Sequence, residues 1–508
     1  MEWHREAYWL RHAGSSPFKL HWRALTVRHC FHVLPGESIL EIGAGSGLWT
    51  AHLSQVLRGE NPITAAVFNS DLARQATAKG MPNVEVACVS DLADLPDESF
   101  DYIVGTAILC HSEFAQNLRH IHRLLKPGGQ LLFFESNYWN PQVALKHWIP
   151  ALGRWAGNAS CQIGLRSYDL MKIASSQGFT HIDVIPFDII HPKTPRQLIP
   201  LLDSTAFVLE QAPLLRHACG TLYVWAKKPG NEADRRPAVN LACHEHLFGQ
   251  VSVVVPCHNE EMNVPRLARA LLQMYEPYIH EIVFVNDNSS DRTAEVTREL
   301  ASRDPRIKLL NRQPPNGVGL ALRDGYAAAT GRYILSMDCD FVQLVPELRD
   351  LFDALAKGVD GAIGSRFTHD SVMLNYPFFK ILCNRAFHLL AKLLLLPEIH
   401  DISNNLKLYK AEIFKNLDLQ QPHFAANAET GLKPILAGYR IEYVPISWIN
   451  RTSEMGSSSF RVVKVAPNYF SALLELIFNV RRQRAPAPGY PEPRTSLVSV
   501  SSHDTSPK

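Results

Sequence analysis

The chain has 508 residues, an apolar content of 46% and a formal net charge of +2. This length favours two or more domains, and so small a charge excludes a nucleic-acid binder that depends on broad attraction to phosphates. The first ten residues are charged instead of apolar, and no uncharged apolar run reaches about 18 residues, so neither a signal peptide nor a membrane-spanning helix is predicted. Nine scattered cysteines without a CxxC pair indicate reduced thiols in a cytoplasmic protein.

Two alternations of strand and helix patterns predict an α/β protein with two domains. The first alternation predicts a parallel sheet covered by helices in residues 1–228. The charged segment 229–248 is predicted to be a linker. Its Cys243, His244 and His246 could form a metal knuckle, but without a second ligand pair a solvated linker is favoured. The alternation restarts in residues 249–482, and the Pro- and Ser-rich residues 483–508 are predicted to be disordered.

A glycine-rich loop follows the first predicted strand, 38–42. It begins after Glu41, and a helical pattern follows its glycines, which are Gly43, Gly45 and Gly47. Glycines let the backbone turn tightly and approach a ligand, and the next helix N-terminus offers unpaired N–H groups. The loop fits a nucleoside ligand with a carboxylate tail, although plain turns and dinucleotide sites share the pattern.

Further motifs follow the loop in a fixed order along predicted strands 63–68, 84–89, 102–106 and 130–135. They are Asp91, the run 95–101 and the run 124–129. Over about residues 38–134 this series resembles the class I methyltransferases that depend on S-adenosylmethionine. The resemblance implies a Rossmann-like sheet and S-adenosylmethionine as cofactor. It also implies a cofactor site that contains Glu41, Gly43, Gly45, Gly47, Asp91 and Leu92, the last two beside the adenine.

One position departs from this family. Relatives usually carry an acidic residue at the end of the second strand, where it binds both ribose hydroxyls, and Val67 stands there. Asn69 or Asp71 is the expected substitute. Methyl transfer depends mainly on positioning, because the sulfonium is already activated, but an oxygen acceptor benefits from a base. His111 and Tyr138 are the candidates on the acceptor side, and a structural role is the alternative for each.

The second alternation predicts strands at 251–256, 281–286, 308–311 and 333–337. Acidic or amide side chains lie at or just after the carboxyl ends of these strands. Asp338 and Asp340 follow the last of these. Side chains of an extended segment alternate between faces, so this pair can project to the same side. Paired carboxylates can hold Mg²⁺ or Mn²⁺ with positions open for phosphates, and the metal offsets the charge of a departing diphosphate. A bare pair of this kind more often lies in a solvated loop.

The pair does not stand alone, because it completes an ordered series. Together with 256–260, 286–291, 364–366, 401–409, 438–440 and 456–458, it resembles the family-2 glycosyltransferases of the GT-A fold, most closely their dolichol-phosphate mannosyltransferase branch. The resemblance implies that the nucleotide is framed by Pro256, Asn259, Glu260, Asp287 and Asp291. It implies that Asp338 and Asp340 hold the metal and the diphosphate, and that Arg366 and Arg451 bind phosphate groups, for which a guanidinium is suited.

Two positions depart from this second family. Asn286 replaces a frequent Asp, and the stretch after Met455 lacks a lysine that relatives often carry. The resemblance implies inverting transfer from a GDP- or UDP-linked sugar to a polyprenyl phosphate or a glycan. A polyprenyl phosphate is anionic near neutral pH, since its second pKa is about 6. A sugar hydroxyl would instead need a base, for which Asp401 and Glu429 are the candidates.

Two apolar segments with interspersed basic residues, 375–397 and 468–481, suit helices that lie in the bilayer interface. Core or dimer helices are the alternative. The leading hypothesis is a bifunctional cytoplasmic transferase with peripheral membrane contact. The second is a glycosyltransferase whose first domain only binds a ligand or partner. The third is an oxidoreductase with a dinucleotide at the glycine loop, which leaves the second half without a role.

Overall fold

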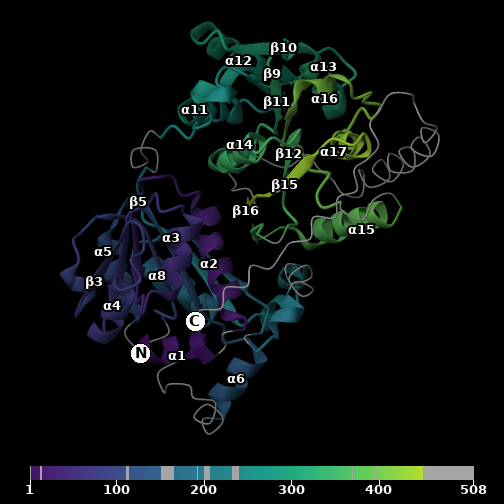
Figure 1. Ribbon diagram of the computed structural model, residues 1–508. Helices are drawn as coiled ribbons and strands as arrows, with labels where there is room; N and C mark the ends of the chain where they lie inside the picture. The colour runs from purple at the N-terminus through teal and green to yellow at the C-terminus, as the bar shows by residue number, and fades with distance from the viewer. Residues whose placement is uncertain are drawn as a thin grey trace, which may run out of the picture.

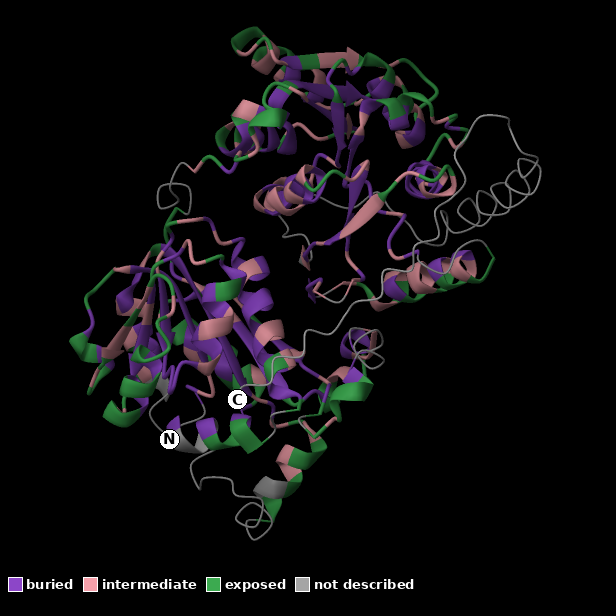
Figure 2. Ribbon diagram, in the orientation of Figure 1, coloured by how far each residue is buried: buried purple, intermediate pink, exposed green. Residues whose placement is uncertain are grey.

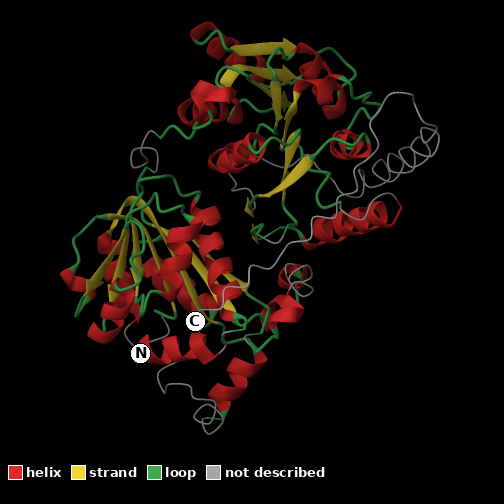
Figure 3. Cartoon of the chain, in the orientation of Figure 1, coloured by secondary structure: helices red, strands yellow, loops and turns green. Residues whose placement is uncertain are grey.

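The structure is a computed structural model that describes residues 2–11, 14–109, 114–149, 165–191, 193–199, 206, 208–231, 239–368, 370–374, 376–394 and 399–449. It has two lobes, each built on a sheet flanked by helices (Figures 1 and 3). Five sequence predictions lie outside the described residues: those on His111, Arg451, the motif 456–458, the segment 468–481 and the tail 483–508.

The first lobe contains a seven-stranded sheet in the order β3-β2-β1-β4-β5-β7-β6. Strands β1 to β5 are parallel, and β7 is antiparallel to β5 and β6. The strands are β1 (Ile39–Ile42), β2 (Ile63–Val67), β3 (Val84–Cys88), β4 (Phe100–Thr106), β5 (Leu125–Ser136), β6 (Thr180–Phe187) and β7 (Thr221–Lys227). The chain order reverses beside β1, which places a ligand crevice at the carboxyl ends of β1 and β4.

The helices of this lobe are α1 (Glu2–Arg11), α2 (Ser16–Phe31), α3 (Leu48–Val56), α4 (Ser70–Thr77), α5 (Phe114–Leu124), α6 (Pro141–Trp148) and α8 (Ser167–Ser176), with short turns η1 (Leu92–Asp94), η2 (Arg196–Leu198) and η3 (Leu215–Ala218). All five strands predicted before residue 136 are present. The difference is at β5, which begins at Leu125 because this residue pairs with Phe100 ahead of an irregularity in the register.

The second lobe contains a seven-stranded sheet in the order β10-β9-β8-β11-β14-β12-β15 and a pair β13-β16. Strands β8 to β11 are parallel, and β14 is antiparallel to β11 and β12. The strands are β8 (Val251–Cys257), β9 (Ile279–Asn286), β10 (Ile307–Asn311), β11 (Tyr333–Ser336), β12 (Gly361–Ser365), β13 (Met373–Leu374), β14 (Lys407–Lys410), β15 (Ile441–Pro445) and β16 (Trp448–Ile449). The fold class predicted from the sequence, two α/β sheets in succession, is confirmed.

Helices cover both faces of this sheet, which keeps its central strands buried (Figures 2 and 3). The segment from Val251 to Val255 is apolar except for Ser252, which is typical of a strand covered on both sides, and all five residues are buried. The helices are α11 (Asn263–Tyr275), α12 (Thr293–Arg303), α13 (Val318–Ala328), α14 (Leu348–Ala356), α15 (Phe378–Leu394), α16 (Ala411–Lys415) and α17 (Ala426–Leu436), with short turns η4 (Glu245–Leu247), η5 (Glu276–Tyr278) and η6 (Phe341–Glu347).

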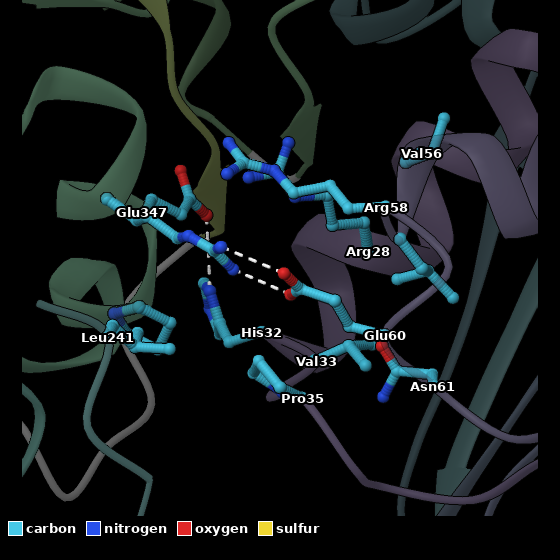
Figure 4. Close-up of a pocket in the computed structure, with 13 residues that line it drawn as sticks. Arg28, His32, Val33, Pro35, Val56, Arg58, Glu60, Asn61, Leu241 and Glu347 are labelled. Atoms are coloured by element: carbon cyan, nitrogen blue, oxygen red, sulfur yellow. Dashed lines mark hydrogen bonds and ion pairs between the residues drawn. The ribbon is translucent and has the colours of Figure 1, made fainter. Parts of the chain in front are cut away.

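The lobes meet along a seam, here defined as the contact between α2, α3 and their following loops on one side and η6 and α14 on the other. Arg349 donates to both carboxylate oxygens of Glu60, at 2.6 and 2.8 Å. Asp350 accepts from Arg28 and Arg58, each at 2.5 Å. Figure 4 shows His32 facing Glu347 in the cavity of this seam. The first-lobe residues that line this cavity precede β1 and β2, so the cavity lies at the amino ends of these strands.

Apolar side chains also cross the seam. Leu34 of the first lobe packs in the core cluster of the second, while Val372 and Leu374 pack in a core cluster of the first. Burial of these side chains in the opposite lobe contributes about 1.5–3 kcal/mol each. The two sheets are therefore joined by shared cores as well as by ion pairs.

The predicted linker is partly packed instead of solvated, because its two leucines are buried. Leu241 and Leu247 are 6% and 0% exposed and belong to the core cluster of the second lobe. The structure adds Asp353 to the neighbourhood of Cys243 and His244. His244 Nε2 already lies 2.8 Å from Asp353 Oδ1, so a hydrogen bond accounts for this contact.

Candidate active sites

The glycine loop has the backbone that its sequence predicts. β1 ends at Ile42, and Gly43, Gly45 and Gly47 have φ of 69°, 59° and 75°. Only glycine adopts this region without strain, so each residue is fixed by the turn itself. Gly47 is the N-cap of α3. The loop and the first turn of α3 thus present backbone N–H groups and the positive end of a helix dipole at the carboxyl edge of the sheet.

The two substitutes expected for the acid at Val67 are engaged elsewhere. Asn69 Oδ1 caps α4 by accepting from Asp71 N and Leu72 N, both at 3.0 Å. The Asp71 carboxylate pairs with Arg74 on the exposed side of the same helix. These contacts hold both side chains at the start of α4, and ribose binding by Asn69 or Asp71 stays a prediction from the sequence.

Asp91 and Leu92 lie after β3, at the same edge as the glycine loop. Asp91 forms a capping box with Asp94 at η1: its Oδ1 accepts from Ala93 N at 3.0 Å, and its N–H donates to Asp94 Oδ2 at 3.1 Å. Leu92 is buried. Their adenine-binding role remains a prediction from the family resemblance.

The acceptor side contains one group that the sequence analysis missed. Glu135, near the end of β5, is 1% exposed and accepts from Ile108 N and Leu109 N at 2.8 and 2.9 Å. It thereby holds the loop after β4. Tyr138, the predicted candidate, accepts from Trp148 Nε1 at 3.2 Å, and this hydrogen bond, followed by the one from Arg166, lowers the pKa of Tyr138.

In the second lobe, two loops at the carboxyl edge are bound to each other. Asn259, at φ 59°, donates from its N–H to Ser289 Oγ at 3.0 Å and accepts from Ser290 N at 2.8 Å. Asp291 Oδ2 accepts from Glu261 N at 3.2 Å. Glu260 N donates to Thr293 Oγ1 at 2.8 Å. The predicted nucleotide residues after β8 and after β9 are therefore brought together, with Pro256 at the end of β8.

Asp287 is held at the centre of this edge. Its Oδ2 accepts from Gly317 N at 2.7 Å, and its Oδ1 pairs with Arg312. Arg312 also donates to Asp324 Oδ2 at 2.7 Å. Sequence reasoning missed Arg312, because a single arginine after a strand has no motif of its own. These contacts fix the Asp287 carboxylate in one orientation.

Asp338 and Asp340 follow β11 and are both partly exposed. Asp338 Oδ1 accepts from Asn405 Nδ2 at 2.7 Å, and Asp340 is the N-cap of η6. β8 separates β9 from β11, so normal strand spacing puts the ends of β9 and β11 about 10 Å apart. Asp287, Asp338 and Asp340 therefore share one edge of one sheet, as predicted.

Arg366, predicted to bind phosphate, forms a bidentate pair with Asp401. Its Nε and Nη2 donate to the two carboxylate oxygens at 2.7 and 2.9 Å, and Nη2 also donates to Ser403 Oγ at 3.2 Å. Burial by itself raises the pKa of Asp401, but the charge and hydrogen bonds of Arg366 outweigh it and hold that pKa far below its usual value.

This pairing argues against the predicted role of Asp401 as a base, because a fully buried carboxylate with so low a pKa takes up a proton poorly. The alternative base, Glu429, is 3% exposed. It accepts from Gln420 N and Gln421 N at 3.1 and 2.8 Å and pairs with Lys433 at 2.7 Å. Both carboxylates hold neighbouring groups in place, so neither geometry favours general-base catalysis.

Two buried basic groups beside Asp401 were missed from the sequence. His388 lies on α15; its Nδ1 donates to Asn384 O at 2.7 Å, and its Nε2 accepts from Ile402 N at 3.0 Å. Burial lowers the pKa of His388 to about 4, so its ring is neutral at pH 7. Burial also lowers the pKa of Lys407 to about 7. In the sequence, His388 was marked only by the apolar segment that contains it, and Lys407 only by its place in the motif 401–409.

Each lobe thus has a sheet whose parallel strands carry the predicted site residues at their carboxyl ends. Residues 40–133 match the family model described as a methyltransferase domain. Residues 252–418 match the model described as glycosyl transferase family 2. The chain is therefore an enzyme that combines a methyltransferase domain with a family-2 glycosyltransferase domain.

Among characterised proteins, the second lobe is similar to polyprenol monophosphomannose synthase of Mycolicibacterium smegmatis, with 29% identity over 41% of this chain and 82% of that protein. It is also similar to dolichol-phosphate mannosyltransferase of Pyrococcus furiosus, with 32% identity over 30% of this chain and 44% of that protein. The chain covers 35% of a third relative, glycosyltransferase AglD of Haloferax volcanii, at 28% identity.

Solved structures similar to the chain include a SAM-dependent methyltransferase, possibly a histamine N-methyltransferase by its description, from Thermotoga maritima. Its identity is 17%, its TM-score is 0.32, and the match covers 44% of this chain and 94% of that one. Phosphoethanolamine N-methyltransferase 2 of Haemonchus contortus matches with 16% identity and a TM-score of 0.31, over 42% of this chain and 57% of that one.

Proposed function

We propose that this chain is a bifunctional transferase. Its first lobe transfers a methyl group from S-adenosylmethionine, and its second transfers a sugar, with inversion, from a nucleoside diphosphate to a polyprenyl phosphate. The observation that carries the proposal is the pair of sheet edges: one lined by three glycines with positive φ, the other by Asp287, Asp338 and Asp340. The two mannosyltransferase relatives support a lipid-phosphate acceptor.

The donor edge fits a divalent cation. Asp338 and Asp340 are carboxylates on one short loop, and oxygen donors of this kind suit Mg²⁺ or Mn²⁺. When bound, such an ion offsets the negative charge of the departing nucleoside diphosphate. Asn405 orients Asp338 by its 2.7 Å hydrogen bond, and Asp340 stands at the N-cap position of η6 without a side-chain hydrogen bond to that turn. The interlocked loops at Asn259 and Asp291 shape the nucleotide end of the same edge.

The acceptor end needs no protein base. A phosphate monoester is anionic above about pH 6, so its oxygen can attack the anomeric carbon directly. Arg366 is fixed in the site by Asp401, and its guanidinium carries the positive charge that an acceptor phosphate requires. Neutral His388 supports the backbone of Ile402 beside this pair. The depressed pKa of Asp401 is consistent with a positioning role.

The glycine loop fits S-adenosylmethionine, because a carboxylate tail suits backbone N–H groups at a helix start and the cationic sulfonium suits nearby acids. Glu41 and Glu135 supply buried negative charge at this edge. When bound, the cofactor provides an activated methyl group, so the protein mainly orients the acceptor and excludes water. A ligand-binding domain without methyl transfer is the second candidate, supported by Val67.

The structure describes no helix that is long and apolar enough to cross a membrane. Helix α15 nevertheless has an exposed apolar stripe at helical spacing, defined by Phe379, Leu382, Ala386, Leu389 and Leu393. The four large residues are 48–75% exposed, and the helix contains basic but no acidic side chains. We propose that this stripe lies on an anionic lipid surface, where the acceptor resides.

Replacing Leu389 and Leu393 with serine is expected to lower the fraction of protein that floats with anionic liposomes by at least about tenfold, since each buried leucine contributes about 1.5–3 kcal/mol. Met262→Ser, which removes an exposed apolar residue that precedes α11, is the matched control. Equal flotation of the double variant and the wild type would contradict lipid contact. A concentration-dependent dimer lost in the double variant would assign the stripe to a second copy.

The proposed activities are tested with the full chain, polyprenyl phosphate, Mg²⁺ or Mn²⁺ and a panel of nucleotide sugars, followed by mass analysis of the lipid with and without S-adenosylmethionine. We expect a mass increase of one hexose with one donor, and 14 Da more on some product or acceptor when the methyl donor is present. Absence of lipid glycosylation with every donor contradicts the first activity. Absence of both methylation and S-adenosylmethionine binding contradicts the second.

A further inference from the structure

Helix α1 brings two carboxylates to the glycine-loop edge of the first lobe. Glu2 and Glu6 are four residues apart and lie on one face of the helix. Glu2 Oε2 accepts from Phe68 N at 3.0 Å, one residue beyond the end of β2. Glu6 Oε2 accepts from Ser46 N at 3.4 Å, and its Oε1 accepts from Ser46 Oγ within the glycine loop after β1.

The spacing of these acids matches that of the strands below them. Four residues of helix rise about 6 Å, and adjacent strands lie about 4.8 Å apart. β1 and β2 are neighbours in the sheet. Helix α1 therefore runs across the two strand ends and sets one acid over each, as its position along the lower edge of the first lobe shows (Figure 1).

The anchoring of α1 is separate from these acids. Trp9 is 7% exposed and belongs to a core cluster of the lobe, and Ser16 Oγ donates to its carbonyl at 2.8 Å. The acids themselves are each only 7% exposed. Burying a carboxylate costs more than burying an apolar or neutral polar side chain, and a neutral acceptor could satisfy Phe68 N equally well. Packing alone therefore does not explain two charges at this position.

We propose that Glu2 and Glu6 bind S-adenosylmethionine in the first lobe, an inference that rests on the proposed methyl transfer. Glu2 accepts hydrogen bonds from the ribose hydroxyls at the end of β2, where Val67 offers no polar group. Glu6 accepts from the α-ammonium group beside the glycine loop. The backbone N–H groups of Phe68 and Ser46 hold the two carboxylates in place for these contacts.

The charge of the ligand supports this assignment. S-adenosylmethionine carries a sulfonium and an ammonium group, and Glu41 adds a third buried carboxylate at the same edge. Lys79 is the basic group electrostatically coupled to Glu6 and Glu41; burial lowers its pKa, and these two acids raise it. Helix α1 thus supplies an acid at the end of β2, where Val67 offers none, and a further acid beside the glycine loop.

The test uses full-length Glu2→Gln and Glu6→Gln, because glutamine keeps an oxygen for the backbone N–H and removes only the charge. Glu85→Gln, an exposed acid on β3, is the control. Binding is measured calorimetrically with S-adenosylmethionine and with methylthioadenosine, which keeps the ribose but lacks the amino-acid end. Loss of a charged hydrogen bond predicts about ten- to hundredfold weaker binding.

Glu2→Gln is expected to weaken both ligands, and Glu6→Gln only S-adenosylmethionine. Unchanged affinity in both variants, or tighter binding because the acids merely block the site, would overturn the inference while the proposed methyl transfer stands. Failure of the wild-type chain to bind S-adenosylmethionine would overturn both. Equal melting temperatures of the three variants without ligand show that α1 remains docked.

Discussion

Replacing Asp338 or Asp340 with asparagine lowers the rate of sugar transfer by at least about a hundredfold and leaves methyl transfer unchanged. Each change removes one negative charge from the donor edge, where a group that stabilises developing charge accounts for about a hundred- to thousandfold in rate. Asparagine preserves the shape, so Asn405 can still contact position 338, and the start of η6 does not depend on the side chain at position 340. Steady-state rates of both reactions in the same preparation provide the measurement.

Asp304→Asn is the matched control, because Asp304 lies in the same lobe and pairs with Arg306 at its surface. Loss of both activities in the Asp338 variant, with the melting temperature retained, would show that the two sites are not independent. Unchanged sugar transfer in both variants would remove the carboxylate pair from the proposed donor site.

The Glu347→Ala change is expected to lower the free energy of unfolding by about 3–5 kcal/mol, the cost of breaking a buried ionic group. Glu347 is 3% exposed at the seam, and its Oε2 accepts from Ser447 N at 2.7 Å. Its Oε1 lies 3.1 Å from His29 Nδ1 and 3.2 Å from His32 Nδ1. Urea unfolding is the measurement, with Glu295→Ala, an exposed acid paired with Arg292, as control.

The control change is expected to cost no more than about 1 kcal/mol. If Glu347→Ala unfolded at the same urea concentration as the control, the buried carboxylate would have no part in holding the lobes together. Separate unfolding transitions for the two lobes in the variant would show directly that the seam joins them.

The contribution of Glu347 to the free energy of unfolding is expected to depend on pH in a defined way. Burial by itself raises the pKa of Glu347, but His29 and His32 outweigh it and hold the pKa well below the usual value. A lowered folded-state pKa adds stability above the unfolded pKa of about 4.3 and loses it as the pH falls through the folded value. The stability difference between wild type and Glu347→Gln should therefore persist at pH 5 and shrink only below about pH 4.

The sequence alone was sufficient to predict the two sheets and to place most of the candidate residues at the carboxyl edges of these sheets. Strand patterns report local burial, and the loops after β1, β8, β9 and β11 follow directly from chain order. Parallel strands place their carboxyl ends together, which is why Asp287 and Asp338 could be assigned to one edge. The linker prediction was less accurate, because the buried leucines 241 and 247 form no periodic pattern.

Contacts between distant segments could not be predicted in this way. Glu2 and Glu6 lie 66 and 40 positions before their hydrogen-bond partners Phe68 and Ser46. Nothing in the local pattern indicates that α1 crosses the strand ends. The Arg366–Asp401 pair, which argues against a base, likewise depends on how the loop after β12 packs against the segment 399–406. Such contacts follow from tertiary packing, which periodicity does not encode.

The seven residues of η6 connect the donor site to the seam. Asp340 immediately precedes η6, and Glu347 is the last residue of η6. If the gene were split between the lobes, the second lobe alone would keep Glu347 at the end of η6. This buried carboxylate would then lack His29 and His32, which belong to the first lobe. We therefore expect the two lobes to be inherited together in one gene, and homologues that contain only the second lobe to carry a neutral residue at the position of Glu347.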